Sequence, residues 1–312
     1  MHRGQPLAYS AVIPTKDRPE DAGEAVRVLL RQTRPPERVV VVDASDPAYA
    51  LPDELAAQAA RLSVELLIVA SRPSTSAQRN LGARAVETPI VLFLDDDVRL
   101  PPDYAEALLD RWEAAGLEAL GGLAGTPAVV PRQGAVSRAV RRLLMLNYVD
   151  PSGEAMTLRR SGNVRYVPEP RRAVHVPALG AGATAYRTDL ARAHPFDERF
   201  PGYAPGEDLD MAYRVAAAAP ILQTPEVRWT HLWHPRERAS PTRWRVRGRC
   251  ETYFRLRRLD RSPLTLAAFA LSLVAEAGIA LADSVRERDL RHVRGFAAGA
   301  LESVRGELLR ND

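Results

Sequence analysis

Three consecutive aspartates, Asp95, Asp96 and Asp97, are the residues whose type and spacing most directly suggest chemistry. They follow an apolar run, 89–94, that has the composition of a buried strand. Three like charges at a strand's end repel one another and are costly to desolvate, so a cation or hydrogen-bond donors must offset them. Hard ions such as Mg²⁺ and Mn²⁺ bind carboxylate oxygens and can also hold substrate phosphates. The run therefore predicts a metal and phosphate site, with a solvated acidic turn as the alternative.

A second acidic group, 206–214, reads GEDLDMAYR. Glu207, Asp210 and Arg214 have the spacing of one helical face, so their plainest interpretation is an ion-paired helix start. Acidic residues are favoured in a first helical turn by the helix dipole in any case. Asp208 points away from that face, which leaves its carboxylate open to another role.

Two histidines, His231 and His234, alternate with aromatic residues in the segment WTHLWH. Isolated histidines between aromatics are usually packed residues. Because carboxylates lie upstream, however, a histidine from this distant segment could complete a manganese site, since Mn²⁺ accepts imidazole together with carboxylates.

The elements that must position these groups alternate between strand and helix along the first half of the chain. Apolar runs predict strands, and amphipathic patterns between them predict helices; the strands are 10–13, 38–42, 64–70 and 89–94, and the helices are 21–32, 52–61 and 77–86. After the aspartates, two prolines and the expected N-cap Asp103 open another helix. This repeat predicts an α/β fold with a mainly parallel sheet, and it puts the aspartates at the carboxyl edge where ligands bind.

The loop after the first strand, 14–19, has neither a GxGxxG nor a GxxxxGK[ST] arrangement, so nothing supports a dehydrogenase or a P-loop protein. Residues 121–175 are rich in proline, glycine and arginine around a helical patch, 136–146, and we expect an insertion over the sheet edge on the acceptor side.

Composition places few further limits on function. The 312 residues are 46% hydrophobic and 26% charged, with a net charge of +4. The single cysteine, Cys250, excludes an intramolecular disulfide framework, and the first eight residues show no secretion signal. We expect a cytoplasmic protein that could also associate peripherally with the inner face of the cell membrane.

Several motifs in order resemble the GT-A nucleotide-sugar glycosyltransferases, particularly the large inverting family 2. The resemblance covers roughly 10–258 and rests on SAVIPTKDRP, VVVVDASD, SAQRNLGA, FLDDDVRLPPD, GAGATAYR with FDERF, and GEDLDMAYR followed by THLWHP. It implies a GT-A fold and a divalent metal, Mn²⁺ or Mg²⁺. It divides the chain into a catalytic domain, 1–235, with a nucleotide half of about 1–120 and an acceptor half of about 121–235, and a basic helical extension, 236–312.

The resemblance also implies roles for individual residues. The nucleotide-sugar site would be lined by Thr15, Asp17, Arg18, Asp43, Arg79, Asp95 and Asp96, with Asp43 accepting a hydrogen bond from the base, usually uracil, and Arg79 near the phosphates. The metal would be bound by Asp95, Asp97 and His231, with His234 as the alternative histidine. Asp208 matches the general base, and Glu207 is the fallback. The acceptor side would include Gly182, Trp233 and His234.

This set of residues predicts a specific reaction. Negative charge develops on the departing nucleoside diphosphate, where a metal and Arg79 could stabilise it. The acceptor hydroxyl needs a separate carboxylate to take its proton as it attacks from the opposite face. We therefore expect an inverting, metal-dependent glycosyltransferase. Its donor would be a nucleotide sugar, which we expect to be a UDP-sugar, and its acceptor would be a glycan, a lipid-linked saccharide or a small molecule.

Other functions stay open. Within the same fold, a retaining glycosyltransferase or a nucleotidyltransferase would use many of the same residues. From a different class, an inactive nucleotide-sugar or membrane-binding module is the alternative. No nucleic-acid module is recognisable, so we expect no nucleic-acid partner, and whether the chain forms a homo-oligomer is left open.

The C-terminal extension differs from the predicted catalytic domain. Residues 236–261 hold ten arginines against three acids, and 262–282 carries one charge, Glu276, in an apolar run. An amphipathic helix packed on the catalytic domain and an interfacial helix on anionic lipid both fit this pattern.

Overall fold

The computed structural model describes residues 6–129, 133–180, 182–200, 202, 204–232 and 241–308. The contacts within the chain define two compact units. The sheet unit comprises 1–130, 169–202 and 211–233, and the helical unit comprises 131–168, 203–210 and 234–312. The domain boundary expected near residue 235 stays a prediction, because these contacts group two earlier segments with the C-terminal helices.

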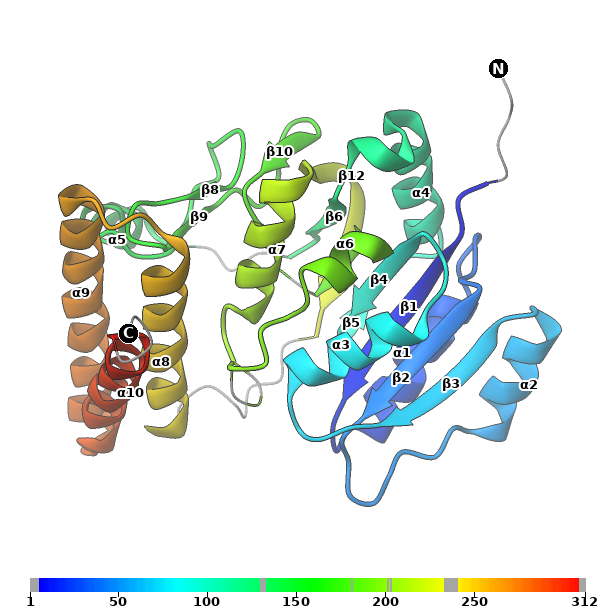
Figure 1. Ribbon diagram of the computed structural model, residues 1–312, viewed down its shortest axis with the longest axis horizontal. Helices are drawn as coiled ribbons and strands as arrows, with labels where there is room; N and C mark the ends of the chain where they lie inside the picture. Colours follow the sequence, from blue (N-terminus) through cyan, green and yellow to red (C-terminus); the bar gives the residue numbers. More distant parts are fainter. Residues whose placement is uncertain are drawn as a thin grey trace. The chain divides into compact units, whose positions relative to one another are not determined.

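One large mixed sheet forms the sheet unit (Figure 1). Its strands run in the order β10-β12-β6-β11-β4-β1-β2-β3, and β5 pairs with β12 beside this path. The strands are β1 (Tyr9–Thr15), β2 (Arg38–Asp43), β3 (Glu65–Ala70), β4 (Ile90–Leu94), β5 (Val98–Arg99), β6 (Gly122–Pro127), β10 (Val174–Val176), β11 (Ala183–Arg187) and β12 (Ile221–His231).

Helices connect these strands and cover the sheet. They are α1 (Pro19–Leu30), α2 (Asp53–Arg61), α3 (Thr75–Ala85), α4 (Tyr104–Ala115), α6 (Thr188–Ala193) and α7 (Glu207–Ala218), with a 3₁₀ turn, η1 (Leu117–Ala119). Every residue of β1 and β4 is buried, as expected for strands covered on both faces. Asp103 occupies the N-cap position of α4 as predicted, although its side chain makes no capping hydrogen bond.

The predicted α/β fold is confirmed, but the sheet is less parallel than expected. Strands β3-β2-β1-β4 are parallel, whereas β11 is antiparallel to both β4 and β6. The sequence obscured β6 because its glycines resemble a loop signal. In the structure Gly125 is needed for close approach, since a Cβ there would overlap the carbonyl oxygen of Val227.

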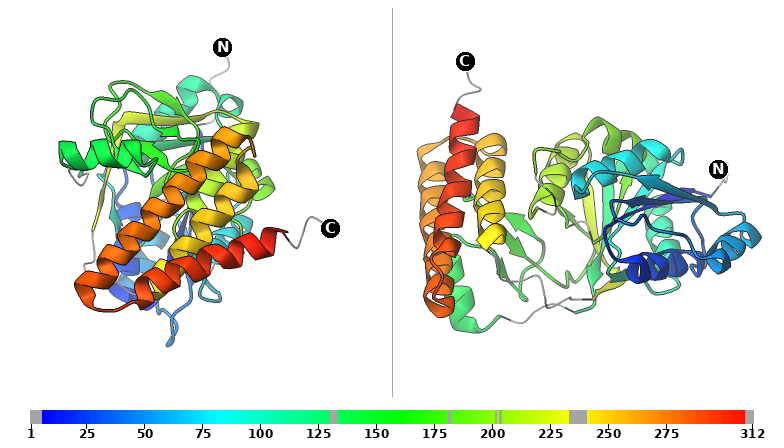
Figure 2. Two further views of the ribbon diagram at one scale, coloured as in Figure 1. Left: turned by 90° about the vertical axis from the view of Figure 1, so that its left-hand side faces the viewer. Right: turned by 90° about the horizontal axis from the view of Figure 1, so that it is seen from below.

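The helical unit consists of three long helices, a shorter helix and a small sheet (Figure 2). The helices are α5 (Ala135–Leu143), α8 (Pro241–Arg258), α9 (Pro263–Glu287) and α10 (Arg291–Leu308), and the strands of the sheet are β7 (Tyr148–Val149), β8 (Thr157–Leu158) and β9 (Val164–Tyr166). Helices α8 and α10 pack closely through Gly248 and Gly299. A Cβ on either glycine would overlap a carbonyl oxygen of the opposite helix.

Helix α9 is apolar and mostly exposed. Among the described residues it is the one helix whose length and composition would suffice to cross a membrane, and 28% of its most apolar window is buried within the structure. Core helices of soluble proteins can meet the same length and composition test, so this observation alone does not establish a membrane span.

Candidate functional site

The first aspartate of the predicted motif forms a buried ion pair. Asp95 follows β4 directly, and its backbone N–H donates to the carbonyl oxygen of Gly182 at 3.1 Å. Its carboxylate accepts a hydrogen bond from Arg79 Nη2 at 2.6 Å. The Arg79 side chain is 2% exposed and lies over the ring of Phe196. Asp95 therefore faces a guanidinium, and its predicted role as a metal ligand stays a prediction.

The second aspartate is enclosed by residues of the first loop. Thr15 Oγ1 donates to Asp96 Oδ2 at 2.8 Å, and Arg18 Nη1 donates to Asp96 Oδ1 at 3.3 Å. Burial raises the pKa of Asp96 to about 6, although the hydrogen bond from Thr15 and the charge of Arg18 act in the opposite direction. The structure thus brings Thr15, Arg18 and Asp96 together, and their role in binding a nucleotide sugar stays a prediction.

The third aspartate lies beside the predicted histidine. Asp97 Oδ1 is 3.6 Å from His231 Nε2, and Asp97 Oδ2 is 3.4 Å from Arg18 Nη1. The main chain sets this approach: His231 is paired with Val98 in the antiparallel β5–β12 ladder, and Leu232 N–H donates to the Asp97 carbonyl at 2.8 Å. Sheet pairing therefore joins two segments far apart in the sequence.

The Asp97–His231 pair is the part of the site that fits a metal ion. Two ligands that are each about 2.1 Å from one ion lie roughly 3–3.5 Å from each other, close to the distance observed here. Within the described part of the chain, no three His, Cys, Asp or Glu side chains are gathered as a metal-binding group. Asp97 and His231 are therefore the two predicted ligands that the structure brings to a suitable distance from each other.

Asp17 and Asp43 hold the loops around the predicted nucleotide site. Asp43 is buried and accepts hydrogen bonds from the backbone N–H groups of Ser45 at 3.0 Å and Tyr49 at 2.6 Å. Asp17 has a positive φ of 56° and its N–H donates to Ser45 Oγ at 2.7 Å. Base recognition by Asp43 stays a prediction, because both of its oxygens already support the loop after β2.

Gly182 lies beside the end of β4 for a steric reason. A Cβ at this position would be 2.8 Å from the ring of Trp229. The small residue therefore lets Trp229 pack against the backbone that holds Asp95. Its predicted contact with the acceptor stays untested, and the other two acceptor residues, Trp233 and His234, lie outside the described residues.

The second acidic group begins α7, and its first residues belong to the helical unit. Asp210 is fully buried and forms an ion pair with Arg258 of α8, with Asp210 Oδ2 3.2 Å from Arg258 Nη2. Glu207 is buried near Cys250. The pKa of the Cys250 thiol is raised mainly by burial and, to a smaller extent, by the negative charge of Glu207. Asp208 differs from both because it lines a pocket.

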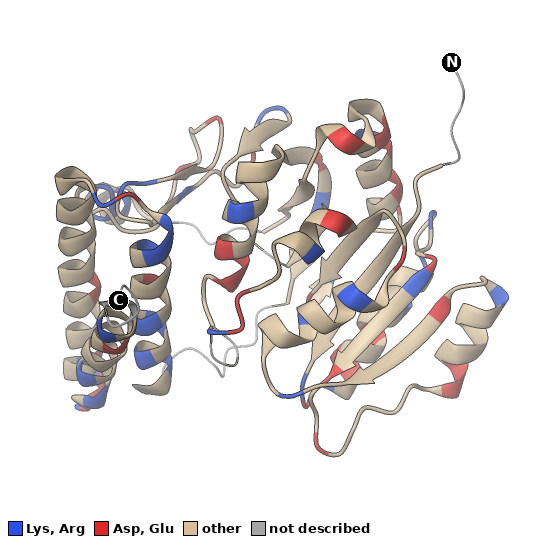
Figure 3. Ribbon diagram, in the orientation of Figure 1, with Lys and Arg blue, Asp and Glu red and all other residues tan. Residues whose placement is uncertain are grey.

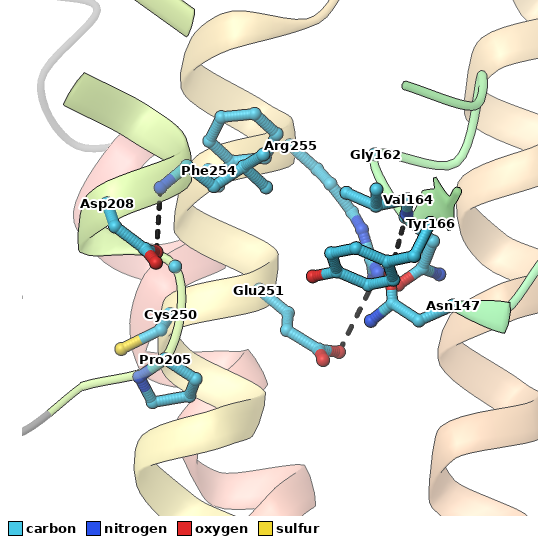
Figure 4. A pocket seen from close by; sticks show the side chains of 13 residues that line it. Asn147, Gly162, Val164, Tyr166, Pro205, Asp208, Cys250, Glu251, Phe254 and Arg255 are labelled. Carbon is cyan, nitrogen blue, oxygen red and sulfur yellow. Dashed lines mark hydrogen bonds and ion pairs between the residues drawn. The ribbon is translucent and has the colours of Figure 1, made fainter. Parts of the chain in front are cut away.

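That pocket lies within the helical unit and has about 520 Å³ of space, part of it open to solvent (Figure 4). In the close view, Asp208 and Phe254 lie on one side, Tyr166 and Asn147 lie on the other, and Glu251 lies between them. A carboxylate facing a polar and aromatic pocket can bind a hydroxyl group and accept its proton.

Sequence reasoning missed several residues that organise these sites. Gln78 Nε2 donates to the carbonyl oxygens of Thr15 and Val42, both at 2.8 Å, and so joins the ends of β1 and β2. Its place in the motif SAQRNLGA was the available signal. Tyr166, Glu251 and Arg255 come from segments read only as an insertion and a basic extension, where no pattern predicted a pocket.

The mixed sheet with its covering helices has the GT-A fold of nucleotide-sugar glycosyltransferases. A family profile described as "Glycosyl transferase family 2" matches residues 10–144. Residues 10–144 are thus similar to the family 2 glycosyltransferases. No curated protein is a significant match by sequence.

Solved structures support the same fold. GalNAc-T7 with UDP, GalNAc and Mn²⁺ has 12% sequence identity and a TM-score of 0.57, and the match covers 86% of this chain and 54% of that chain. S. aureus TarS has 18% identity and a TM-score of 0.52, covering 85% and 43%. The mannosyltransferase PcManGT from Pyrobaculum calidifontis, in complex with GDP-Man and Mn²⁺, has 15% identity and a TM-score of 0.52, covering 96% and 88%. The chain thus spans about half the length of the first two proteins.

Proposed function

We propose that this protein is a metal-dependent inverting glycosyltransferase that moves a sugar from a UDP-sugar to the hydroxyl group of an acceptor. The observation that carries the proposal is that Asp208 lines a pocket of its own, while the three aspartates after β4 form a separate cluster with arginines and a histidine. Inversion needs both: charge stabilisation at the leaving group and a separate base for the incoming hydroxyl.

The cluster after β4 suits the donor diphosphate. Arg18 contacts Asp96 and Asp97, and Arg79 contacts Asp95, so two guanidinium groups lie beside the predicted phosphate site. Asp97 and His231 would hold Mn²⁺ or Mg²⁺, which when bound would neutralise charge on the leaving phosphate. The arginines would orient the diphosphate and remain paired to the aspartates after it departs.

The pocket residue Asp208 suits the acceptor. In the proposed step its carboxylate takes the proton of the acceptor hydroxyl, and the oxygen attacks the anomeric carbon as the bond from that carbon to the phosphate oxygen breaks. The electron pair of that bond leaves with the nucleoside diphosphate. Attack opposite to the leaving group inverts the anomeric configuration.

Substitution of Asp208 tests this assignment. Asp208→Asn retains the size of the side chain but removes the base, so transfer should slow by about 10²- to 10⁴-fold while donor affinity is unchanged. Both quantities can be measured by steady-state transfer kinetics and by titration of UDP with Mn²⁺. Glu207→Gln is the matched control and should cost less. If Glu207→Gln is inactive and Asp208→Asn is normal, the roles are exchanged; if neither slows transfer, the inverting mechanism is wrong.

A further inference from the structure

One arginine in the acceptor pocket is buried with few partners. Arg255 of α8 lines the pocket, and its side chain is 2% exposed. Among the described residues, no acceptor forms a hydrogen bond with its Nε or Nη1. Its ion pair with Glu251 is long, at 3.6 Å between Arg255 Nη2 and Glu251 Oε2. The guanidinium also lies over the ring of Phe269, which supplies no hydrogen-bond acceptor.

Such an arrangement is unfavourable for the folded protein by itself. A buried guanidinium that leaves N–H groups without acceptors loses its hydration without full compensation. Burial accordingly lowers the pKa of Arg255. Replacing an underpaired buried charge by an apolar side chain is often neutral or stabilising, so stability alone does not account for this arginine.

The charges around the pocket leave room for an anion. Arg247 contacts both nearby carboxylates, Glu251 Oε1 at 3.0 Å and Glu276 Oε1 at 2.8 Å. Burial raises the pKa of Glu276 to about 7, so this group is partly neutral at physiological pH. Arg247 thus makes the short contacts to both carboxylates, and Arg255 is left with its long contact to Glu251.

We propose that the pocket binds an acceptor that carries a carboxylate or phosphate group, and that Arg255 recognises this anion while Asp208 receives the hydroxyl. This inference rests on the proposed function. It deepens that function by naming the class of acceptor, an anionic one. Charge-assisted hydrogen bonds from a guanidinium to such a group would satisfy the donors that the folded chain leaves unmet.

Binding of inorganic phosphate tests the anion site without any need for turnover. Arg255→Met should weaken phosphate binding by about 10- to 100-fold, as expected for lost hydrogen bonds to a charged group, and should leave thermal stability unchanged or raised. Calorimetric titration and thermal unfolding measure the two quantities. Arg257→Met, at an exposed position of the same helix, is the matched control and should change neither. Equal phosphate affinity in the Arg255 variant, or no phosphate binding by the unmodified protein, would overturn the proposal.

Transfer assays separate this inference from the proposed function. Methyl glucoside, methyl glucuronide and glucose 6-phosphate form a matched series of neutral, carboxylate and phosphate acceptors, and phosphatidylglycerol vesicles offer a phosphate from a lipid. The unmodified protein should prefer the anionic acceptors, and Arg255→Met should lose that preference. Comparison of the soluble acceptors with the vesicles shows whether the anion belongs to a soluble sugar or to a lipid headgroup. Transfer without a preference for anions contradicts the inference alone. Phosphate binding that depends on Arg255, with no transfer to any acceptor, contradicts the proposed function instead.

A second, independent observation concerns the orientation of α9. The residues buried along this helix are small or polar, namely Thr265, Ala268, Ser272, Glu276, Ala280 and Ser284. Leu273 and Ile279 pack against a small cluster formed by Trp244, Ala280 and Phe296. Six other large apolar side chains are exposed, namely Leu264, Leu266, Leu271, Val274, Leu281 and Val285. Water-soluble bundles have the opposite arrangement. Figure 3 shows α9 with few charges along most of its length, whereas α8 carries repeated arginines.

Helix α5 of the same unit combines an exposed apolar face with positive charge. Val136, Val140 and Leu143 are exposed at helical spacing, and Arg138 and Arg142 lie between them in the sequence. A basic amphipathic helix with exposed apolar residues is complementary to the headgroups and outer acyl region of an anionic bilayer.

We infer that the exposed faces of α5 and α9 dock on an anionic lipid surface. The test is sedimentation of the full chain with vesicles that contain phosphatidylglycerol, compared with neutral phosphatidylcholine vesicles. Joint replacement of Leu264, Val274 and Val285 by Gln should reduce binding by at least about 10-fold, since each buried aliphatic side chain adds to partitioning. The matched control, Leu62→Gln with Ile68→Gln, changes exposed apolar residues of the sheet unit and should have no effect.

The arginines of α5 provide the electrostatic arm of this test. Joint Arg138→Gln and Arg142→Gln should reduce binding to anionic vesicles by roughly 5-fold per arginine, and high salt should reproduce part of the loss. Equal binding of the unmodified chain to neutral and anionic vesicles would overturn the charge argument. A stable dimer that the triple Gln substitution dissociates, without vesicle binding, would show that a second copy covers the face.

Discussion

The end of β4 and the interior of the helical unit both gather buried charges, but they do so differently. At the end of β4, each of three adjacent aspartates has a cationic or hydroxyl partner, and the apolar residues lie in the core. In the helical unit, Arg255 has buried donors that meet no acceptor among the described residues, and six large apolar residues of α9 are exposed. The first region resembles a binding site ready for a charged ligand, whereas in the second region some buried donors have no acceptor among the described residues.

This difference predicts how each region would respond to a ligand. The aspartate cluster is compensated before any donor arrives, so a ligand must exchange one set of contacts for another. The helical unit keeps an underpaired charge and an exposed apolar face, so an anion and a lipid surface would add contacts where few exist. Stability is thus expected to lie mainly in the sheet unit, and responsiveness to ligands in the helical unit.

The strongest way to break this comparison is to remove Asp97, the proposed metal ligand of the sheet unit. Asp97→Ala should reduce transfer by roughly 10²- to 10⁴-fold, because metal stabilisation of the leaving group contributes several kcal/mol. EDTA should reproduce the loss in the unmodified protein, and circular dichroism should show that the fold persists. Asp103→Ala, at an exposed position that makes no capping hydrogen bond, is the control. Full activity in EDTA would exclude a role for metal.

A second test compares close packing in the two units. Gly82 of α3 faces Val12 of β1, and Gly299 of α10 faces the backbone of Arg245 in α8; a Cβ at either position would overlap these atoms. Gly82→Val and Gly299→Val should each lower the free energy of unfolding by about 1–3 kcal/mol or more. Urea denaturation measures the change. Gly306→Ala, on α10 with open space around it, should instead stabilise by about 0.5–1 kcal/mol. A neutral Gly299→Val would mean that α8 and α10 do not pack closely in solution.

The last prediction is a pH dependence located in the helical unit. Burial raises the pKa of Glu276 to about 7, so the folded state keeps a proton that the unfolded state releases near its ordinary pKa of 4.5. The folded state binds more protons between these values, and stability should therefore fall by up to about 3 kcal/mol as pH rises from 4.5 to 7 and then level off. Glu276→Gln should flatten this slope in urea denaturation across that range. An unchanged slope in the variant would assign the titration to another group.

The sequence predicted the strands around the aspartates because their β-branched and apolar runs can only be buried in a sheet. It also indicated which segments meet at the carboxyl edge, although the Arg79–Asp95 ion pair was not foreseen. The sequence did not predict β6, because glycines are typical of loops. In the sheet, Gly125 of this strand allows the backbone of Val227 to approach closely. The pocket was not predictable, because Asn147, Tyr166 and Arg255 come from segments whose contacts are entirely tertiary.

The two-residue strand β5 has a consequence for engineering. Because β5 pairs with the end of β12, the position of His231 relative to Asp97 depends on ladder hydrogen bonds and not on the intervening acceptor-side segments. Residues 133–168 leave the large sheet after β6 and rejoin it at β10, without contributing to that ladder. In a chimaera, residues 133–168 could therefore be exchanged to alter the proposed acceptor specificity while the arrangement of Asp97 and His231 is retained.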